Sequence, residues 1–185
     1  MKAKSPGGVD ERYLDLRRLG DGSTHHLTKA GGRSLAEAAA CCLESRGHPM
    51  DCTLTLCGES DATYRLRRLK VDDRMRRTHA DTQEATELGA CGVAILVVTS
   101  ATDYKVVQRA YKGTGFDYWL TRQGSKSLSF DARLEVSGIL DGSKATIAAR
   151  SKQKLVQTDV SDHTRLPAYA VIVEFGAPRA SMVKK

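Results

Sequence analysis

Two short segments on either side of residue 60 alternate apolar and polar side chains. Residues 53–56 read Thr-Leu-Thr-Leu and residues 63–67 read Thr-Tyr-Arg-Leu-Arg, with Gly58-Glu59-Ser60-Asp61 between them. A period of two is typical of a strand with one buried face. Turn-forming residues between two such runs indicate a hairpin. The pattern therefore predicts a β-hairpin in this part of the chain.

Three longer segments have the composition and start signals of helices. Ser34-Leu35-Ala36-Glu37 has the form of a capping box, which predicts a helix over residues 35–46. A similar pattern at Asp81 precedes a strongly apolar run, and we expect a core helix from there to about Ser100. Residues 143–158 are rich in Ala, Lys and Gln and follow an Asp-Gly turn, which favours a third helix.

The remaining apolar runs are short and rich in β-branched or aromatic residues. We expect strands at residues 104–111, 116–120, 132–139 and 169–175, and one short strand within residues 13–19. Three consecutive strands separated by glycine-bearing turns favour an antiparallel meander. The second half of the chain is thus predicted to run helix, three strands, helix, strand, and the fold class is α+β.

The composition is that of a globular protein with a surplus of positive charge. The chain has 185 residues, 41% of them hydrophobic, a net charge of +7 and five cysteines. The number of cysteines is odd, and the N-terminal residues show no signal-peptide pattern. We therefore expect free thiols in a reducing cytoplasm. The longest apolar run, residues 90–98, is too short to span a membrane, so no membrane segment is expected.

The positive charge is concentrated in one segment, which suggests nucleic acid as the partner. Seven basic residues fall within thirteen positions, and from this basic hairpin we expect phosphate contacts by Arg65, Arg67, Arg68, Arg76 and Arg77. A solvated basic edge without a ligand is the alternative interpretation. No phosphate-binding glycine loop and no Gly-x-Ser-x-Gly elbow occurs, which argues against a nucleotide-driven machine and a serine hydrolase.

Two acids stand out because each lies in or beside a predicted strand. Asp117 follows Gly115-Phe116, and Glu135 lies between Leu134 and Val136. If the two strands pair, both carboxylates can reach one face of the sheet and offer oxygen ligands to a hard cation such as Mg²⁺. Taken alone, the two acids are better explained as a turn cap and a surface ion-pair partner, because exposed strand acids are common.

The order of elements together with these acids resembles the core of the PD-(D/E)xK nuclease superfamily. Gly115-Phe116-Asp117 is similar to the superfamily's Gly-x-Asp element, and Glu135-Val136-Ser137 to the strand that bears its (D/E)xK motif. The resemblance implies a restriction-endonuclease-like core, a mixed sheet flanked by helices. It also implies Mg²⁺ or Mn²⁺ held by Asp117, Glu135 and an acid of the preceding helix, Glu87 or its neighbour Glu84.

One position departs from the resemblance. Ser137 stands where the superfamily has its lysine, and a hydroxyl carries no positive charge. Some members supply the lysine from the following helix, where this chain has Lys152 and Lys154. We therefore expect catalysis by Asp117, Glu135 and one of these two lysines. A lysine nitrogen within about 4 Å of an acid oxygen, the ordinary reach of an ion pair, would favour an enzyme.

These expectations divide the chain into an N-terminal α+β appendage, residues 1–80, and a nuclease-like core, residues 81–185. The predicted function is metal-dependent hydrolysis of phosphodiester bonds, in DNA rather than RNA. The alternatives are an inactive nuclease-like module that binds nucleic acid or a protein partner, and a plain α+β interaction domain whose acids are incidental. A homodimer or a complex with a second protein is compatible with each.

Overall fold

The computed structural model describes residues 12–22, 27–125 and 128–185. The described residues form strands and helices, and two short 3₁₀ segments, η1 and η2, accompany them. The elements are β1 (Arg12–Asp15), η1 (Leu16–Leu19), α1 (Lys29–Ser45), β2 (Asp51–Gly58), β3 (Ala62–Arg67), α2 (Asp73–Thr78), α3 (Thr82–Ala101), β4 (Tyr104–Arg109), β5 (Tyr118–Arg122), β6 (Ala132–Ile139), α4 (Lys144–Gln157), η2 (Thr158–Thr164), β7 (Ala168–Glu174) and β8 (Arg179–Lys184).

All eight described strands form one mixed, curled sheet in the order β1-β3-β2-β8-β7-β6-β5-β4. β4, β5 and β6 form the predicted antiparallel meander, and β7 then pairs parallel with β6. A parallel neighbour requires a crossover connection, and α4 with η2 supplies it. The fold class is therefore α+β, as predicted, and the order helix, three strands, helix, strand is confirmed for α3 to β7.

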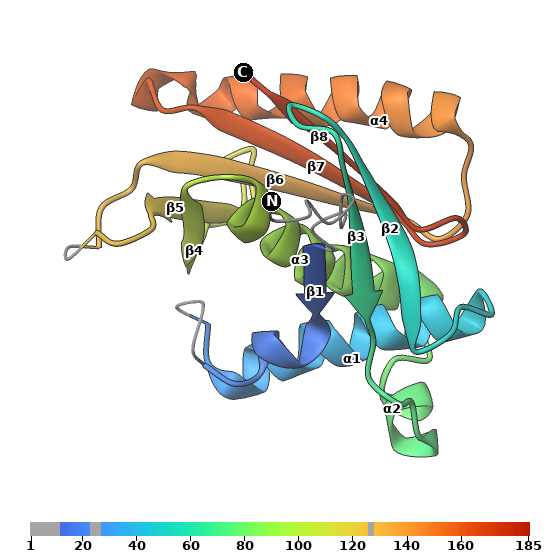
Figure 1. Ribbon diagram of the computed structural model, residues 1–185. Coiled ribbons are helices and arrows are strands. Elements are labelled where there is room, and N and C mark those ends of the chain that lie inside the picture. The colour runs from blue at the N-terminus through green and yellow to red at the C-terminus, as the bar shows by residue number, and fades with distance from the viewer. Residues whose placement is uncertain (1–11, 23–26, 126–127) are drawn as a thin grey trace, which may run out of the picture.

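The helices cover both faces of the sheet (Figure 1). α4 lies across β6, β7 and β8 on one face, and α3 lies on the other with α1 packed against it. β7 is buried along its whole length because helices cover it on both sides. The core accordingly lies between the sheet and α3, where Val93, Leu134, Val171 and their neighbours pack together.

The first eighty residues share this sheet and this core. β2 and β3 form the predicted hairpin, in which Leu54, Leu56 and Tyr64 are buried on one face. β2 also pairs parallel with β8, so the hairpin continues the sheet that begins at β4. The predicted appendage is therefore joined to the predicted core through main-chain hydrogen bonds as well as through packing.

The structure corrects the predicted elements at three points, namely one boundary and two elements that were not predicted. α1 begins at Lys29, capped by the Thr28 hydroxyl, six residues before the predicted start. Gly31 and Gly32 lie inside this helix, and an added Cβ on Gly32 would meet the Leu19 carbonyl oxygen at 1.7 Å. α2 and β8 were not predicted, although Ala180 and Met182 of β8 are buried.

α3 needs separate mention because it is strongly apolar. Among the described helices it alone is long and apolar enough, by length and composition, to cross a membrane. Its most apolar window is 67% buried inside the protein, where α1 and the sheet cover it. A core helix of a soluble protein has the same properties, and the structure is compatible with that interpretation.

Candidate functional site

A pocket of about 440 Å³ opens where the meander, α3 and α4 meet. Its walls come from the first half of α3, the end of β4, the residue before β5, the middle of β6 and one side of α4. Asp117, Glu135, Lys154 and Glu87 of the predicted site all line it, together with Glu84, whereas Lys152 does not. Residues separated by up to seventy positions in the sequence are thus brought to one cavity.

Asp117 is held at the entrance to β5, which begins two residues later than predicted. Its backbone N–H donates to Leu134 and its carbonyl accepts from Ala110, so the residue is fixed between the neighbouring strands. Its Oδ2 accepts a hydrogen bond of 2.9 Å from the Val136 N–H. Arg109 lies 3.8 Å from the other carboxylate oxygen. Main-chain geometry therefore aims this carboxylate at the middle of β6.

Glu135 lies at the centre of β6 with its side chain only 3% exposed. Its Oε1 accepts hydrogen bonds from Lys154 Nζ at 2.7 Å and from Gln157 Nε2 at 3.0 Å. Both donors come from the last turns of α4, which passes over β6 on its way to β7. The lysine nitrogen thus lies well within the ordinary reach of an ion pair with Glu135, about 4 Å.

The environment of Glu135 shifts its titration strongly. The pKa of this carboxyl is raised to about 7, first because burial removes water from the charged form and second because the Asp117 carboxylate lies beside it. The hydrogen bond and charge of Lys154 act in the opposite direction without cancelling the rise. A buried carboxyl whose pKa is raised by burial and by a second carboxylate is typical of a functional site.

Helical spacing distinguishes the two candidate lysines. Ile147 and Ser151 are the buried residues of α4 and mark the side that faces the sheet. At 3.6 residues per turn, Lys154 lies within about 20° of Ile147 around the axis, whereas Lys152 lies about 140° away. Lys152 is accordingly exposed. The periodicity of the apolar positions could have selected Lys154 from the sequence alone.

Ser137, which stands where the resemblance implied a lysine, contacts an arginine of α4. Its Oγ accepts a 3.0 Å hydrogen bond from Arg150 Nη1. Both residues line the pocket. Arg150 was not among the predicted site residues, although it lies one turn before Lys154 on the same side of the helix. No sequence signal could have found it, because a cation on a polar helix looks like an ordinary solvated residue.

The acids of α3 contribute to the pocket without joining the carboxylate pair. Glu84 and Glu87 are exposed, and Glu87 Oε1 accepts a hydrogen bond from Gln83 one turn earlier. Within the described residues no three His, Cys, Asp or Glu side chains are grouped closely enough to hold a metal ion. Glu87, predicted as a third ligand, therefore stands apart from Asp117 and Glu135 in this arrangement.

The other reactive side chain of the pocket is a thiol. Cys91 of α3 is buried, and the pKa of its thiol is raised to about 12, mainly by burial and further by the charge of Asp117. Arg109 donates a 2.9 Å hydrogen bond to the Tyr118 hydroxyl beside it. A thiol with so high a pKa stays protonated at neutral pH and is a poor nucleophile. Thiol catalysis is therefore not supported here.

The chemistry of the carboxylate pair suits a hard divalent cation. Mg²⁺ binds to one or two carboxylates and fills its remaining positions with water and substrate phosphate oxygens. Asp117 and Glu135 offer two such oxygen ligands at a pocket. Zinc prefers three or four protein ligands with nitrogen or sulfur among them, which this pair does not supply. The donor set thus fits Mg²⁺ or Mn²⁺.

The predicted basic surface is divided by the structure. Arg65 and Arg67 lie on β3, Arg67 in an ion pair with Asp51, whereas Arg76 and Arg77 lie on α2. Arg76 is paired with acids of α1 and α2, and Arg77 is exposed.

Arg68 is the buried member of that set. It is 9% exposed, and its guanidinium donates to the carbonyls of His48 and Leu69. These contacts support the local fold. Charge alone does not distinguish a buried, bonded guanidinium from an exposed one, and the phosphate contact of Arg68 stays a prediction.

Comparison with known proteins adds no relative. No family model matches the chain, and neither the search of curated proteins nor the search of solved structures found a match.

Proposed function

We propose that this protein is a metal-dependent nuclease with a restriction-endonuclease-like core formed by α3, β4, β5, β6, α4 and β7. Support comes from the connection of these elements: an antiparallel meander followed by a parallel strand across a helical crossover. The resemblance noted in the sequence implies the same arrangement, with its acids at the start of the second strand and within the third.

One observation carries the proposal. Lys154 Nζ lies 2.7 Å from Glu135 Oε1, and both residues line the same pocket as Asp117. The positive charge that Ser137 cannot supply is thereby present beside the acids, delivered from α4. An incidental strand acid would be exposed, whereas Glu135 is buried beside a like charge at a cost to stability.

In this proposal Asp117 and Glu135 hold Mg²⁺ or Mn²⁺ through their carboxylate oxygens. A bound cation of this kind lowers the pKa of water and neutralises charge on a phosphate. Lys154 keeps Glu135 oriented and, together with Gln157, holds one of its oxygens in a fixed position. The β-sheet supplies rigidity, since Asp117 is fixed by main-chain hydrogen bonds to both neighbouring strands.

The substrate class is nucleic acid, and DNA is proposed before RNA. The net charge of +7 and the cations Arg109, Arg150 and Lys154 around the pocket favour a polyanion. A cytoplasmic location accompanies the proposal, because all five cysteines are free thiols. The alternative is an inactive module that binds nucleic acid or a protein without cleaving nucleic acid.

Cleavage of a labelled DNA oligonucleotide and of its RNA counterpart tests the proposal. We expect cleavage with Mg²⁺ or Mn²⁺, none with EDTA, and loss of at least about a hundredfold in Asp117→Asn, because one of two metal ligands is removed. Asp51→Asn is the matched control, since Asp51 lies on β2 in an ion pair with Arg67. Faster cleavage of RNA would reverse the preference for DNA. Equal activity of Asp117→Asn and wild type would remove the pocket from the mechanism.

A further inference from the structure

Two cations of α4 reach the pocket, and their surroundings differ. Lys154 contacts the Glu135 carboxylate at 2.7 Å and the Gln157 side-chain oxygen at 3.0 Å. Its charge therefore compensates a buried acid. Any group that is to bind an incoming phosphate must have donors that are not already bonded in this way.

Arg150 meets that requirement. Ser137 Oγ, at 3.0 Å, is its hydrogen-bond partner, and within the described part of the chain no carboxylate oxygen lies within 4.0 Å of its guanidinium. A guanidinium has five N–H donors in a planar fork. A single neutral acceptor leaves most of these donors available on the side that lines the pocket.

A second arginine of this chain shows what a structural role looks like. Arg133, two residues before Glu135, is 3% exposed, and its guanidinium donates to the carbonyls of Thr158 and Leu166 and to Ser161 Oγ. Those contacts tie β6 to η2 and use most of the donors of Arg133. Arg150 makes no comparable set of contacts, so holding the fold together does not account for its position.

The place in which Arg150 is held points to its ligand. Ser137 is two residues after Glu135, and alternate strand residues share a face, so the guanidinium lies on the side of β6 that carries the metal-binding carboxylates. A planar fork of N–H donors matches two oxygens of one phosphate group. A phosphate that enters the pocket beside the carboxylate pair would therefore meet this fork.

We propose that Arg150 binds the scissile phosphate and stabilises the negative charge that develops on its oxygens during hydrolysis, and that Ser137 is the positioning residue that holds Arg150 there. The inference rests on the proposed nuclease function. In the reaction a bond forms between a water oxygen and phosphorus, and a bond from phosphorus to a sugar oxygen breaks. The attacking water releases its proton to solvent, and the departing oxygen takes one from solvent. Arg150 acts through its N–H donors and transfers no proton in this step.

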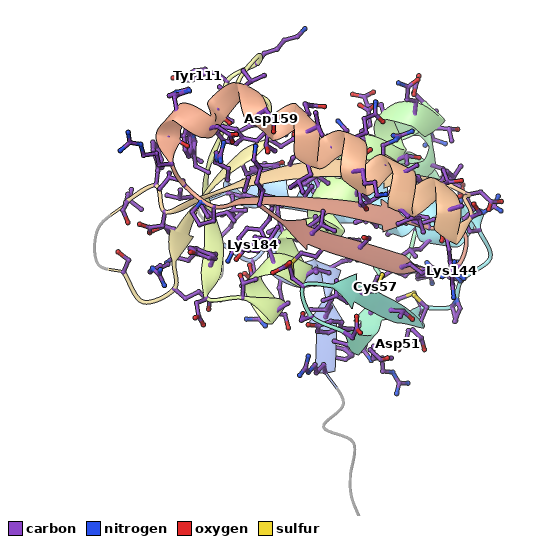
Figure 2. All side chains as sticks on the ribbon, turned by 90° about the horizontal axis from the view of Figure 1, so that it is seen from above. Asp51, Cys57, Tyr111, Lys144, Asp159 and Lys184 are labelled. Carbon is purple, nitrogen blue, oxygen red and sulfur yellow. The ribbon has the colours of Figure 1, made fainter. Side chains whose placement is uncertain are left out.

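The test compares Arg150→Ala and Arg150→Lys with Lys144→Ala in Mg²⁺-dependent DNA cleavage. Lys144 is exposed at the start of α4, at the opposite end from Asp159, and carries the same charge (Figure 2). We expect kcat of Arg150→Ala to fall about a hundredfold with KM within threefold of wild type, as for loss of one transition-state donor. Arg150→Lys keeps the charge and loses the fork, so we expect a loss of about tenfold. Lys144→Ala should retain wild-type kcat.

Ser137 is tested by a readout that a merely structural role would not move. Ser137→Ala should lower kcat about fivefold with KM unchanged, the usual effect of one hydrogen bond, and Ser137→Thr should restore it. DNA affinity without metal, measured by fluorescence anisotropy, should stay within twofold of wild type for Ser137→Ala. Urea midpoints show whether each variant folds.

The possible failures are distinguishable. Suppose that wild type cleaves and that kcat of Arg150→Ala stays within threefold of wild type, with or without a rise in KM. The role of Arg150 is then overturned and the nuclease function stands. If kcat falls for Ser137→Ala and Ser137→Thr does not restore it, the positioning role of Ser137 is overturned. If wild type shows no metal-dependent cleavage of DNA or RNA, the proposed function fails, and the role of Arg150 fails with it.

Discussion

Replacing Glu135 with glutamine should make the metal-free protein more stable at pH 8. The carboxyl is buried, and its pKa is raised from 4.5 to about 7 by burial and by the neighbouring Asp117. The folded protein therefore binds this proton more tightly than the unfolded chain does. Ionisation of Glu135 accordingly destabilises the fold as the pH rises through this interval, with the full cost present above pH 7 and absent below about 4.5.

The size of the effect follows from the same shift. A rise from 4.5 to about 7 corresponds to about 3 kcal/mol of folding free energy at the upper end. Glutamine keeps the shape and can still accept from Lys154 and Gln157, but it loses the attraction of the lysine charge. We therefore expect Glu135→Gln to be about 1–2 kcal/mol more stable than wild type at pH 8, with a difference less than half as large at pH 5.

Urea unfolding in EDTA at the two pH values measures this difference. The chain has a single tryptophan, Trp119, which packs between Phe116 and Phe130 and gives a fluorescence signal for the folded state. Circular dichroism provides a second probe that does not depend on the surroundings of one ring. Millimolar Mg²⁺ should then stabilise wild type and leave Glu135→Gln unchanged, because the variant lacks one of the two proposed ligands.

A second buried glutamate provides the control. Glu174 is 1% exposed, but its carboxylate accepts hydrogen bonds from the backbone N–H groups of Gly176 and Ala177. An amide cannot accept through its nitrogen, so Glu174→Gln should lose about 1–2 kcal/mol at pH 8. The reasoning about Glu135 is refuted if its glutamine variant is less stable than wild type at pH 8, or if the difference is the same at both pH values.

Three further variants test the fold and the basic surface. Gly32→Ala should destabilise the protein by about 1–3 kcal/mol, because the new methyl group would meet the Leu19 carbonyl oxygen where α1 packs against η1. An unchanged thermal midpoint would contradict that packing. Arg77→Ala should reduce the slope of log affinity for DNA against log salt concentration by about 1, because Arg77 is exposed. Arg68→Ala should lower stability and leave that slope unchanged, because Arg68 is buried. Equal slopes for both variants and wild type would remove Arg77 from the interface.

The parts of the fold that could be predicted are those with local signals. Alternation defined β2 and β3, caps defined the start of α3, and glycine-bearing turns separated β4, β5 and β6. β8 had no such signal: it follows β7 after a short turn and is buried because it fills the gap between β7 and β2. One of its two partners, β2, lies more than a hundred residues earlier in the sequence, and no local pattern encodes that pairing.

The candidate site divides along the same line. The carboxylates of Asp117 and Glu135 were identifiable because an acid within an apolar strand conflicts with its neighbours. Arg150 was not, since a cation on a polar helix looks like an ordinary solvated residue. Only the crossover between parallel β6 and β7 shows that this side of α4 passes over Ser137 and Glu135.

The N-terminal half of the chain also has a physical connection to the site, through the seating of α4. Ser151 of α4 donates a 3.0 Å hydrogen bond to Ser181 of β8, and both hydroxyls are buried. β8 is in turn paired with β2 of the N-terminal hairpin. Since Ser151 lies between Arg150 and Lys154, the rotation of α4 that aims these cations at the pocket is fixed by a strand that the hairpin supports. Residues 51–67 therefore stabilise the site from a distance, through the sheet, in addition to any contact they make with a ligand.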